Sequence, residues 1–557
     1  MTTIQKIKKY WALPLLAVVA ACTGDFEDVN TNPLLPNAHQ RTLDGLASGG
    51  LFPGFIQKVK PTRTPGQGTD YPNRYQVAQN IAGDNWIGYM SPGHSKWNQG
   101  KNYTNYFNII GWTNYTFETG IPFIINPYME IKAALHDVVV NDDGTLTYNK
   151  KDLVSQSSYA VAQIVKVMGI HRATDQFGPI PYSQIGAGKF TVAYDSQEQV
   201  YRSFLAELEE AVITLQSYLD AGGTKLLEEY DPVYQGNTAK WIKLGNSLML
   251  RLAIRVRYAD QALATEYASK AINHKGGLLA EKNDAATLQN NGKFMYYNSL
   301  ELLWNDYNDA KMGATIYSYL KGYNDPRMDK YFTKATAGGT TEDFFAVRTG
   351  IRHLADGGTY AQFSRPLIST STPTYWMKAS EIQFLLAEAA LFGITTGDPK
   401  ALYERGIALS FEENDLTVGN YATTTGKPVN YVDSKIQEYS IQAVSTIDKV
   451  WMANGSDEEK LEQIITQKYL AIYPDGQEAW SEWRRTGYPR QFPIPSNVSN
   501  MGARNINGSG TDGGMRRLPY PDSEIRLNAD NLSKAVTLLG GADRASTNVW
   551  WDKKSKN

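Results

Sequence analysis

The chain has one cysteine, Cys22, and six histidines among its 557 residues. A single cysteine excludes an intramolecular disulfide framework and any zinc site built from cysteines alone. The histidines are scattered, and none belongs to a His-Glu-x-x-His motif, which disfavours a zinc hydrolase. The net charge is −2, so the chain lacks the basic character that neutralises phosphates, and we expect no nucleic acid partner.

Signatures of nucleophilic and phosphate chemistry are missing as well. There is no Gly-x-Ser-x-Gly elbow, and the stretch 186–189 lacks the leading glycine and the Ser or Thr of a phosphate loop. Paired carboxylates for glycoside hydrolysis stay open, because only their separation in space identifies them. No cofactor is predicted. The acidic stretch 141–144 has oxygens suited to a structural Ca²⁺, but a type I′ hairpin turn fits it better.

Long apolar runs are also absent, and the run at 11–21 is too short to span a bilayer as a helix. Three lysines precede it and Cys22 follows two alanines, an arrangement typical of a bacterial lipoprotein signal peptide. We therefore predict that residues 1–21 are removed, that Cys22 carries the lipid, and that acyl chains hold the protein on a membrane. An ordinary secretory signal with an incidental cysteine is the alternative.

Amphipathic helices make up much of the remaining chain. Apolar residues spaced i, i+3, i+4, i+7 predict helix pairs at 153–176 and 196–219, 238–257 and 260–274, 376–393 and 399–413, and 433–446 and 456–485. Their predicted N-caps are Asp195, Asp398 and Ser456. The rings that lie on helical stripes, and are therefore expected in the core, are Trp241, Trp480 and Trp483.

The recurring pairs predict a mainly α fold with a tetratricopeptide-like scaffold. They share no tight period, and loop-rich insertions lie near 23–150, 276–375 and 486–557. These insertions are rich in Gly, Asn, Thr, Pro and aromatic residues. Because loops this long in a compact protein usually carry function, we expect them to form the ligand face.

Several strings, in one order along the chain, resemble those of SusD/RagB-type outer membrane lipoproteins of Bacteroidetes. They are DFEDVNTNP at 25–33, FGPIPY at 177–182, ASEI at 379–382, LLAEA at 385–389, WSEWRRTGYP at 480–489 and RRLPYP at 516–521. Each string alone is weak, but together they cover essentially the whole mature chain. One departure is Pro179, where many family members carry an acidic residue. The resemblance implies a single SusD-like domain over 22–557.

The resemblance also implies a function. Such proteins bind glycans, or sometimes peptides, at the cell surface, and they act as a lid on a SusC-like TonB-dependent transporter. It therefore implies a non-catalytic, lipid-anchored protein exposed on the outer membrane. The matching strings are framework motifs, so they carry no ligand-contacting residues to this chain.

Aromatic residues make up 12% of the chain and supply the candidates for a sugar site. Sugar rings have apolar C–H faces and hydroxyl rims, so their sites combine exposed aromatic faces with polar side chains. The stretch from Tyr71 to Tyr128 has this composition and few aliphatic residues. From it and the residue before it we select Asp70, Trp86, Tyr89, Trp97 and Trp112. We expect Trp86 to contact ligand, so that its replacement by Ala weakens binding without unfolding the protein.

Later insertions add three candidates, namely Trp304, Arg365 and Tyr375. The structural alternatives are a core position for Trp304, a surface charge for Arg365 and a turn role for Asp70. Three other functions stay open. They are peptide capture by the same family, hydrolysis of glycosides at the cell surface, and assembly of protein partners by the helix repeats.

Overall fold

The computed structural model describes residues 46–186, 191–352 and 358–556. They belong to two compact units, one ending at Leu51 and the other beginning at Phe52. In the first unit the structure describes the short helix α5 (Leu46–Gly49). Cys22 and the predicted signal peptide lie outside the described residues. The second unit holds all the features discussed below.

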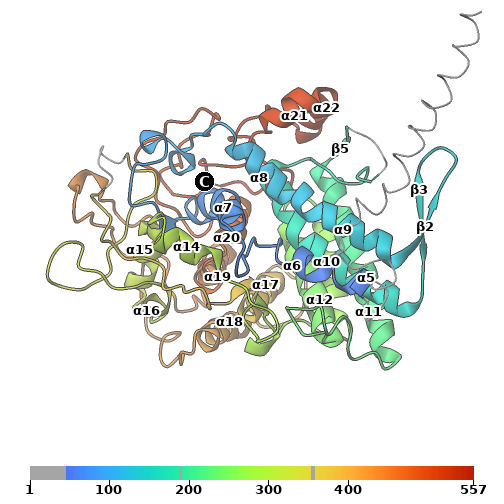
Figure 1. Cartoon of the computed structure of the whole chain (residues 1–557). Coiled ribbons are helices and arrows are strands. Elements are labelled where there is room, and N and C mark those ends of the chain that lie inside the picture. Colours follow the sequence, from blue (N-terminus) through green and yellow to red (C-terminus); the bar gives the residue numbers. More distant parts are fainter. Residues whose placement is uncertain (1–45, 187–190, 353–357, 557) are drawn as a thin grey trace, which may run out of the picture. The chain divides into compact units, whose positions relative to one another are not determined.

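Pairs of long helices form the scaffold of this unit, which confirms the predicted mainly α architecture (Figure 1). The pairs are α10 (Leu153–Phe177) with α11 (Gln197–Asp220), α12 (Thr238–Arg255) with α13 (Gln261–Asn273), α17 (Ala379–Leu391) with α18 (Pro399–Glu413), and α19 (Asp457–Ala471) with α20 (Gly476–Thr486). Each helix of the series α10 to α13 contacts the next, and α12 also contacts α17. The first two pairs are therefore joined to the later ones through α12 and α17.

Most of the scaffold helices begin at a side-chain cap, with α17 as an exception. The caps predicted at Asp398 and Ser456 are confirmed, since each accepts a hydrogen bond from a backbone N–H in the first turn. The cap predicted at Asp195 is wrong, because Ser196 caps α11. Asp195 instead accepts hydrogen bonds from the backbone and hydroxyl of Ser183, 2.7 Å each, and lies in strand β5 (Tyr194–Asp195).

The fourth helix pair differs from the prediction. Residues 433–446 contain a short 3₁₀ turn, η6 (Gln437–Tyr439), and no long helix. Asp433 accepts hydrogen bonds from the backbone N–H groups of Lys435 and Ile436, which favours a turn over a helix. The helix predicted at 456–485 is divided into α19 and α20, because Pro474 has no N–H to donate within a helix. These two helices form the fourth pair.

The predicted apolar stripes form the core of the scaffold. Trp241 and Trp480 are 0% exposed and Trp483 is 2% exposed, which confirms their predicted positions. The other stripe residues that are buried include Val161, Ile164, Val165, Met168, Val200, Phe204, Leu208, Val212, Leu215, Leu244, Leu248, Leu252, Ile382, Leu385, Leu461, Ile464 and Ile465. Each fully buried large apolar side chain contributes about 1.5–3 kcal/mol relative to exposure.

Charged side chains are buried beside this apolar core. Arg251 of α12 pairs with Glu381 of α17 at 2.6 Å. Arg255, one turn further along α12, pairs with Glu478 of α20, and Lys468 of α19 lies 3.4 Å from the same carboxylate. All five side chains are at most 2% exposed. The helix pairs are therefore joined by ion pairs as well as by apolar contacts.

A second part of this network surrounds Glu388 in α17. Arg485 of α20 pairs with it at 2.6 Å and Arg257 at 3.0 Å. Burial alone would raise the pKa of Glu388, but the two guanidinium groups outweigh burial and lower it to about 2. The carboxylate is therefore charged throughout the physiological range. Its stabilising effect is present above pH 4.5 and is lost as the pH falls towards 2.

The strands are short and pair two by two. The antiparallel pairs are β1 (Met90–Ser91) with β7 (Lys311–Met312), β2 (His136–Val140) with β3 (Leu146–Lys150), β4 (Ile180–Pro181) with β5, and β6 (Ala286–Leu288) with β8 (Thr374–Met377). The stretch 141–144 does turn the β2–β3 hairpin, as expected. It is not of type I′, however, because Gly144 alone among these residues has a positive φ, of 80°.

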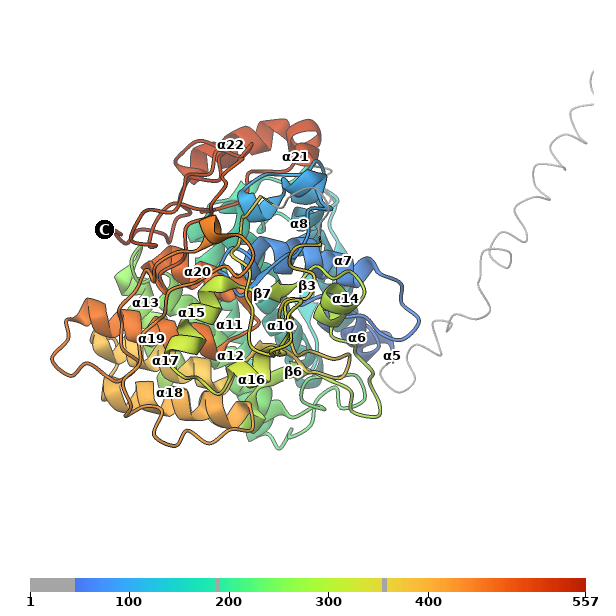
Figure 2. The same ribbon diagram turned by 90° about the vertical axis from the view of Figure 1, so that its left-hand side faces the viewer.

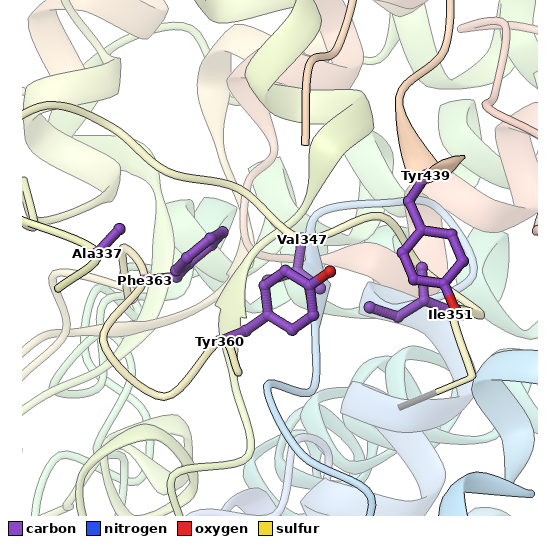
Figure 3. Close-up of a cluster of buried hydrophobic side chains, with 6 residues drawn as sticks. All are labelled: Ala337, Val347, Ile351, Tyr360, Phe363 and Tyr439. Atoms are coloured by element: carbon purple, nitrogen blue, oxygen red, sulfur yellow. The ribbon is translucent and has the colours of Figure 1, made fainter. Parts of the chain in front are cut away.

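Further helices lie in the segments before, between and after the scaffold pairs (Figure 2). They are α6 (Phe52–Ile56), α7 (Asp70–Tyr75), η2 (Gln76–Asp84), η3 (Asn98–Gly100), η4 (Tyr103–Asn105), α8 (Trp112–Gly120), α9 (Pro122–Leu135), η5 (Lys282–Asp284), α14 (Ser299–Asn305), α15 (Ala314–Gly322), α16 (Met328–Tyr331), α21 (Asp522–Leu527) and α22 (Ala529–Leu539). The loop-rich part has a small core of its own, with Val347, Ile351, Tyr360, Phe363 and Tyr439 (Figure 3). These loops are thus folded around buried side chains.

The network predicts a large cost for Glu478→Gln. The substitution removes the charge that faces Arg255 and Lys468, and breaking a buried pair costs about 3–5 kcal/mol of the free energy of unfolding. Urea denaturation followed by circular dichroism measures this loss. The matched control is Glu210→Gln, since Glu210 pairs with Lys150 on the surface, where both side chains are more than half exposed. The control is expected to cost less than about 1 kcal/mol. Equal effects of the two variants would contradict the stabilising role of the network.

Candidate ligand-binding face

Trp86 and Tyr89 lie in the core, which corrects the expectation that they present their rings to a ligand. Trp86 is 7% exposed, and its ring packs 4.8 Å from that of Trp480 in α20. Its indole N–H donates to the backbone oxygen of Tyr103 at 2.7 Å. Tyr89 is 0% exposed and stacks on Tyr469 at 4.5 Å. The local sequence shows neither contact, because both partners come from the last helix pair.

Trp97 and Trp112 are half-buried and lie together at the surface. Their rings meet edge to face, with centroids 5.9 Å apart and planes at 82°. Behind them, the buried ring of Tyr103 contacts Trp112 at 5.0 Å, again edge to face. Nearby on the same segment, Ile110 is 90% exposed. We call Trp97, Trp112 and Ile110 the aromatic face. It offers the apolar surface that a sugar ring can stack on.

The loop that carries Trp97 is held in an unusual conformation. Asn98 and Gln99 have φ values of 47° and 54°, a left-handed region that residues other than glycine seldom adopt. The Asn105 side chain holds this loop by donating to the oxygen of Gly100 at 2.5 Å and accepting from the N–H of Asn102 at 2.9 Å. Such strained positions cluster at ligand-binding sites, where the surrounding structure enforces them. Here they place two exposed amide side chains beside Trp97.

Loop 107–111, which carries Ile110, is fixed from another part of the chain. The side chain of Asn500 accepts from the backbone N–H of Asn108 at 2.7 Å and donates to its oxygen at 3.0 Å. Gly111 follows with φ of 89° and leads directly into α8, whose first residue is Trp112. The exposed aliphatic side chain and the neighbouring indole are therefore presented by a fixed backbone.

A polar rim lies beside Trp112 and contains Asp70. Asp70 is the first residue of α7, and its carboxylate accepts from Arg74 at 2.9 Å and from the Tyr115 hydroxyl at 3.0 Å. Its side chain is still 57% exposed. Burial, together with the Asp70 carboxylate, raises the pKa of Tyr115 to about 12, so its hydroxyl remains a donor at neutral pH. Asp70 thus has free oxygen lone pairs at the surface. It is joined to α8 through Tyr115, which lies three residues after Trp112 in that helix.

His94 and Asp309 support Trp97, and no local sequence pattern indicates either role. Nε2 of His94 lies 2.6 Å from the Asp309 carboxylate, and Nδ1 accepts the Lys96 N–H at 3.2 Å, which assigns the proton to Nε2. The imidazole meets the Trp97 ring edge to face at 4.9 Å. Asp309 comes from the segment before β7 and also accepts from Gln76 at 2.5 Å. The indole is therefore positioned by side chains from three separate segments.

The three remaining candidates lie elsewhere. The guanidinium of Arg365 covers the ring of Trp304 at 4.4 Å, and the indole N–H donates to the oxygen of Ile368 at 2.6 Å. Arg365 therefore packs on a ring in addition to being exposed. Tyr375 lines a separate polar cleft of about 350 Å³ with residues that include Lys240 and Gln289. The structure brings Trp97 and Trp112 into contact and joins Asp70 to Tyr115 of the same helix as Trp112. Trp304, Arg365 and Tyr375 have other partners, although α14, which carries Trp304, contacts α7, which carries Asp70.

Neither a metal centre nor a membrane span is found among the residues that the structure describes. In those residues no group of three or more His, Cys, Asp or Glu side chains is arranged to hold a metal ion. No helix in the same ranges is long and apolar enough to cross a membrane.

Comparison with known proteins gives a family match over nearly the whole chain. The family model for SusD-like proteins, described as SusD and RagB outer membrane lipoproteins, matches residues 28–552. No curated protein matches the sequence. A solved chitin-binding SusD homologue from Flavobacterium johnsoniae is 32% identical, with TM-score 0.81, covering 91% of this chain and 99% of its own.

Two further solved structures agree with this match. A SusD homologue from Bacteroides vulgatus is 31% identical, with TM-score 0.81 over 91% of this chain and 98% of its own. A SusD homologue from Bacteroides uniformis is 34% identical, with TM-score 0.78 over 91% of this chain and 99% of its own. The similarity extends through the scaffold and the loop-rich part alike.

The burial of Trp86 reverses the expected outcome of Trp86→Ala. Removing a buried tryptophan leaves a cavity against Trp480 and is expected to cost about 3–5 kcal/mol of stability. Thermal unfolding followed by circular dichroism tests this. A variant as stable as the parent, but with weaker ligand binding, would restore the original expectation.

His94→Ala is expected to act through Trp97. Without the imidazole, the indole loses its edge contact and Asp309 loses a donor, so the ring is less firmly positioned. We expect weaker ligand binding with a small change in melting temperature, and His94→Gln is expected to recover part of the affinity by donating to Asp309. Quenching of tryptophan fluorescence by acrylamide measures the exposure of the indoles directly. Unchanged quenching and affinity in His94→Ala would contradict the positioning role.

Proposed function

This chain belongs to the SusD-like family of outer membrane lipoproteins, and from this premise we propose that it captures glycans on its aromatic face. The proposed ligand is an oligosaccharide or polysaccharide segment. The protein would hand it to a SusC-like TonB-dependent transporter, serving as the lid of that transporter and carrying out no chemistry itself. In this proposal it is anchored through Cys22 and exposed on the cell surface.

The edge-to-face pair of Trp97 and Trp112 carries the proposal. Two indoles at nearly a right angle form a corner, so that one sugar can stack on a ring face while its neighbour contacts the other ring. The exposed amides of Asn98 and Gln99 and the carboxylate of Asp70 supply donors and acceptors for hydroxyl groups. The chitin-binding relative from Flavobacterium johnsoniae supports a glycan as the ligand class.

The side chains that make up the face favour glycan capture over the alternatives. A glycoside hydrolase needs two carboxyl groups about 5–9.5 Å apart across the scissile bond. At this face the Asp70 carboxylate is bound by Arg74 and Tyr115, an arrangement suited to holding a ligand. A peptide site would favour a deep pocket with donors for the peptide backbone, whereas this face is built from indole rings and amide side chains. Capture of glycan therefore accounts for more of its features.

Titration calorimetry on residues 23–557 tests the proposal. Against a panel of oligosaccharides that includes chitooligosaccharides, we expect Trp97→Ala and Trp112→Ala each to weaken binding by at least about fivefold, since one stacking contact is worth about 1–3 kcal/mol. Melting temperatures are expected to change less than for Trp86→Ala, because both rings are partly exposed whereas Trp86 is buried.

Two matched tryptophan variants act as controls. Trp451→Ala removes a half-buried indole outside the aromatic face and should leave affinity unchanged. Trp304→Ala reports on the other aromatic candidate, which Arg365 covers. Loss of binding in Trp304→Ala alone would move the site there. Binding of peptides but of no glycan, or release of new reducing ends from polysaccharide, would replace the proposal by one of its alternatives.

A further inference from the structure

A small crevice lies at the junction of five segments of the loop-rich part. Its walls come from the turn after η2, Tyr106, the start of α15, the segment 348–349 and the segment 491–506. The residues that matter for its chemistry are Asn85, Thr315, Arg348 and Gln491. Its volume is about 10 Å³, which suits one species of roughly the size of a water molecule.

Asn85 gives this crevice an unusual polar wall. The residue is 1% exposed, and neither its amide nitrogen nor its amide oxygen has a hydrogen-bond partner within the described structure. A buried polar group without a partner costs about 1–3 kcal/mol. A side chain that leaves both atoms unpaired therefore indicates a site that some bound species completes.

Arg348 contributes a positive charge to the same crevice. It is 8% exposed, and three of its N–H groups donate to backbone oxygens, two to Pro493 and one to Tyr439. The other two N–H groups of the guanidinium are not used in these bonds. Among the residues described, no carboxylate lies within ion-pair distance of Arg348. Burial accordingly lowers its pKa to about 10, and only the neighbouring Tyr431 acts in the opposite direction.

Several other buried arginines in this chain are neutralised by carboxylates. Arg327 pairs with Asp325 at 2.6 Å and Arg485 with Glu388 at 2.6 Å, and all four side chains are 0% exposed. A buried charge without a counter-charge is unfavourable by several kcal/mol. Arg348, like the buried Arg484, has only uncharged hydrogen-bond partners among the residues described, but Arg348 in addition lines a crevice with an unpaired amide.

We propose that this crevice binds a monatomic anion, with chloride as its occupant in ordinary saline. The free N–H groups of Arg348 and the amide nitrogen of Asn85 would donate to it. The small volume of the crevice favours a monatomic anion over a carboxylate or phosphate group. This proposal is independent of the glycan function and concerns a separate place in the fold.

The bound anion would hold several segments of the loop-rich part together. Arg348 directly follows Val347, and its acceptor Tyr439 belongs with Val347 to the small core of this part (Figure 3). Pro493 lies in the segment that provides the opposite wall. An anion that binds the Arg348 guanidinium in this crevice would thus also connect segments 85–88, 348–349 and 491–494, which line it. Its binding to the folded state alone raises stability by mass action.

The test compares chloride with gluconate, an anion too large for the crevice, at equal ionic strength. We expect the melting temperature of residues 23–557 to rise by a few degrees with chloride and to saturate. Asn85→Asp places a carboxylate beside Arg348 without changing the size of the side chain, so this variant is expected to lose the dependence on chloride while remaining folded. The control is Arg490→Met, because Arg490 already pairs with Glu462 at 3.2 Å, and it is expected to keep the dependence.

Crystals grown or soaked in bromide give a second, direct measurement. We expect one anomalous peak between Arg348 and Asn85, and none there in Asn85→Asp. A melting temperature that responds equally to chloride and gluconate, together with no bromide peak, would overturn the proposal and leave water as the occupant. A chloride effect that survives in Asn85→Asp would equally overturn it, because the anion would then bind elsewhere.

Discussion

The buried ion pairs between α12, α17, α19 and α20 are the constraint on which the rest of the structure depends. Arg251 and Arg255 of α12 meet carboxylates from α17 and α20, and Lys468 of α19 lies within reach of the same groups. Taking such charges out of water is costly, so only a well-satisfied arrangement is tolerated. The network therefore fixes how the helix pairs lie against one another. Apolar stripes alone would allow a wider range of packing arrangements.

From this network a continuous series of contacts leads to the aromatic face. Helix α20 bears Glu478 on the network and Trp480 two residues further on. Trp480 packs on Trp86, Trp86 on Tyr103, and Tyr103 on Trp112. At the start of the same helix the N–H of Gly476 donates to Asp84 at 2.9 Å, which ties η2 to α20. A Cβ at position 476 would come within 2.3 Å of Asp84, so this close approach requires glycine.

Sequence reasoning succeeded where one segment contains the whole signal. Periodicity was enough to place Trp241, Trp480 and Trp483 in the core, and the caps Asp398 and Ser456 are set by neighbouring residues. It failed for residues 433–446, where the Asp433 carboxylate accepts hydrogen bonds from the backbone and a turn forms in place of the predicted helix. It also failed for Trp86, because the ring that buries Trp86 belongs to a helix far along the chain. Asp70, Trp97 and Trp112 were chosen for composition alone; the structure places the two tryptophans in contact and joins Asp70 to Tyr115 of the helix that Trp112 begins. His94, Asp309, Asn85 and Arg348 act through contacts between distant segments, which no local pattern reveals.

Contacts between distant segments also explain why the rings of the aromatic face are half-buried. A fully exposed indole on a mobile loop must be ordered when ligand binds, at a cost of about 0.5–1.5 kcal/mol for each side chain. Trp97 and Trp112 are already ordered, because their edges rest on His94 and Tyr103 while part of each ring stays at the surface. The left-handed backbone at Asn98 and Gln99 is tolerated because hydrogen bonds from Asn105 hold it. Packing against the scaffold thus orders the aromatic face before ligand binds, so that the face loses little conformational entropy on binding. Such a face suits the capture of a flexible ligand by a few stacking contacts.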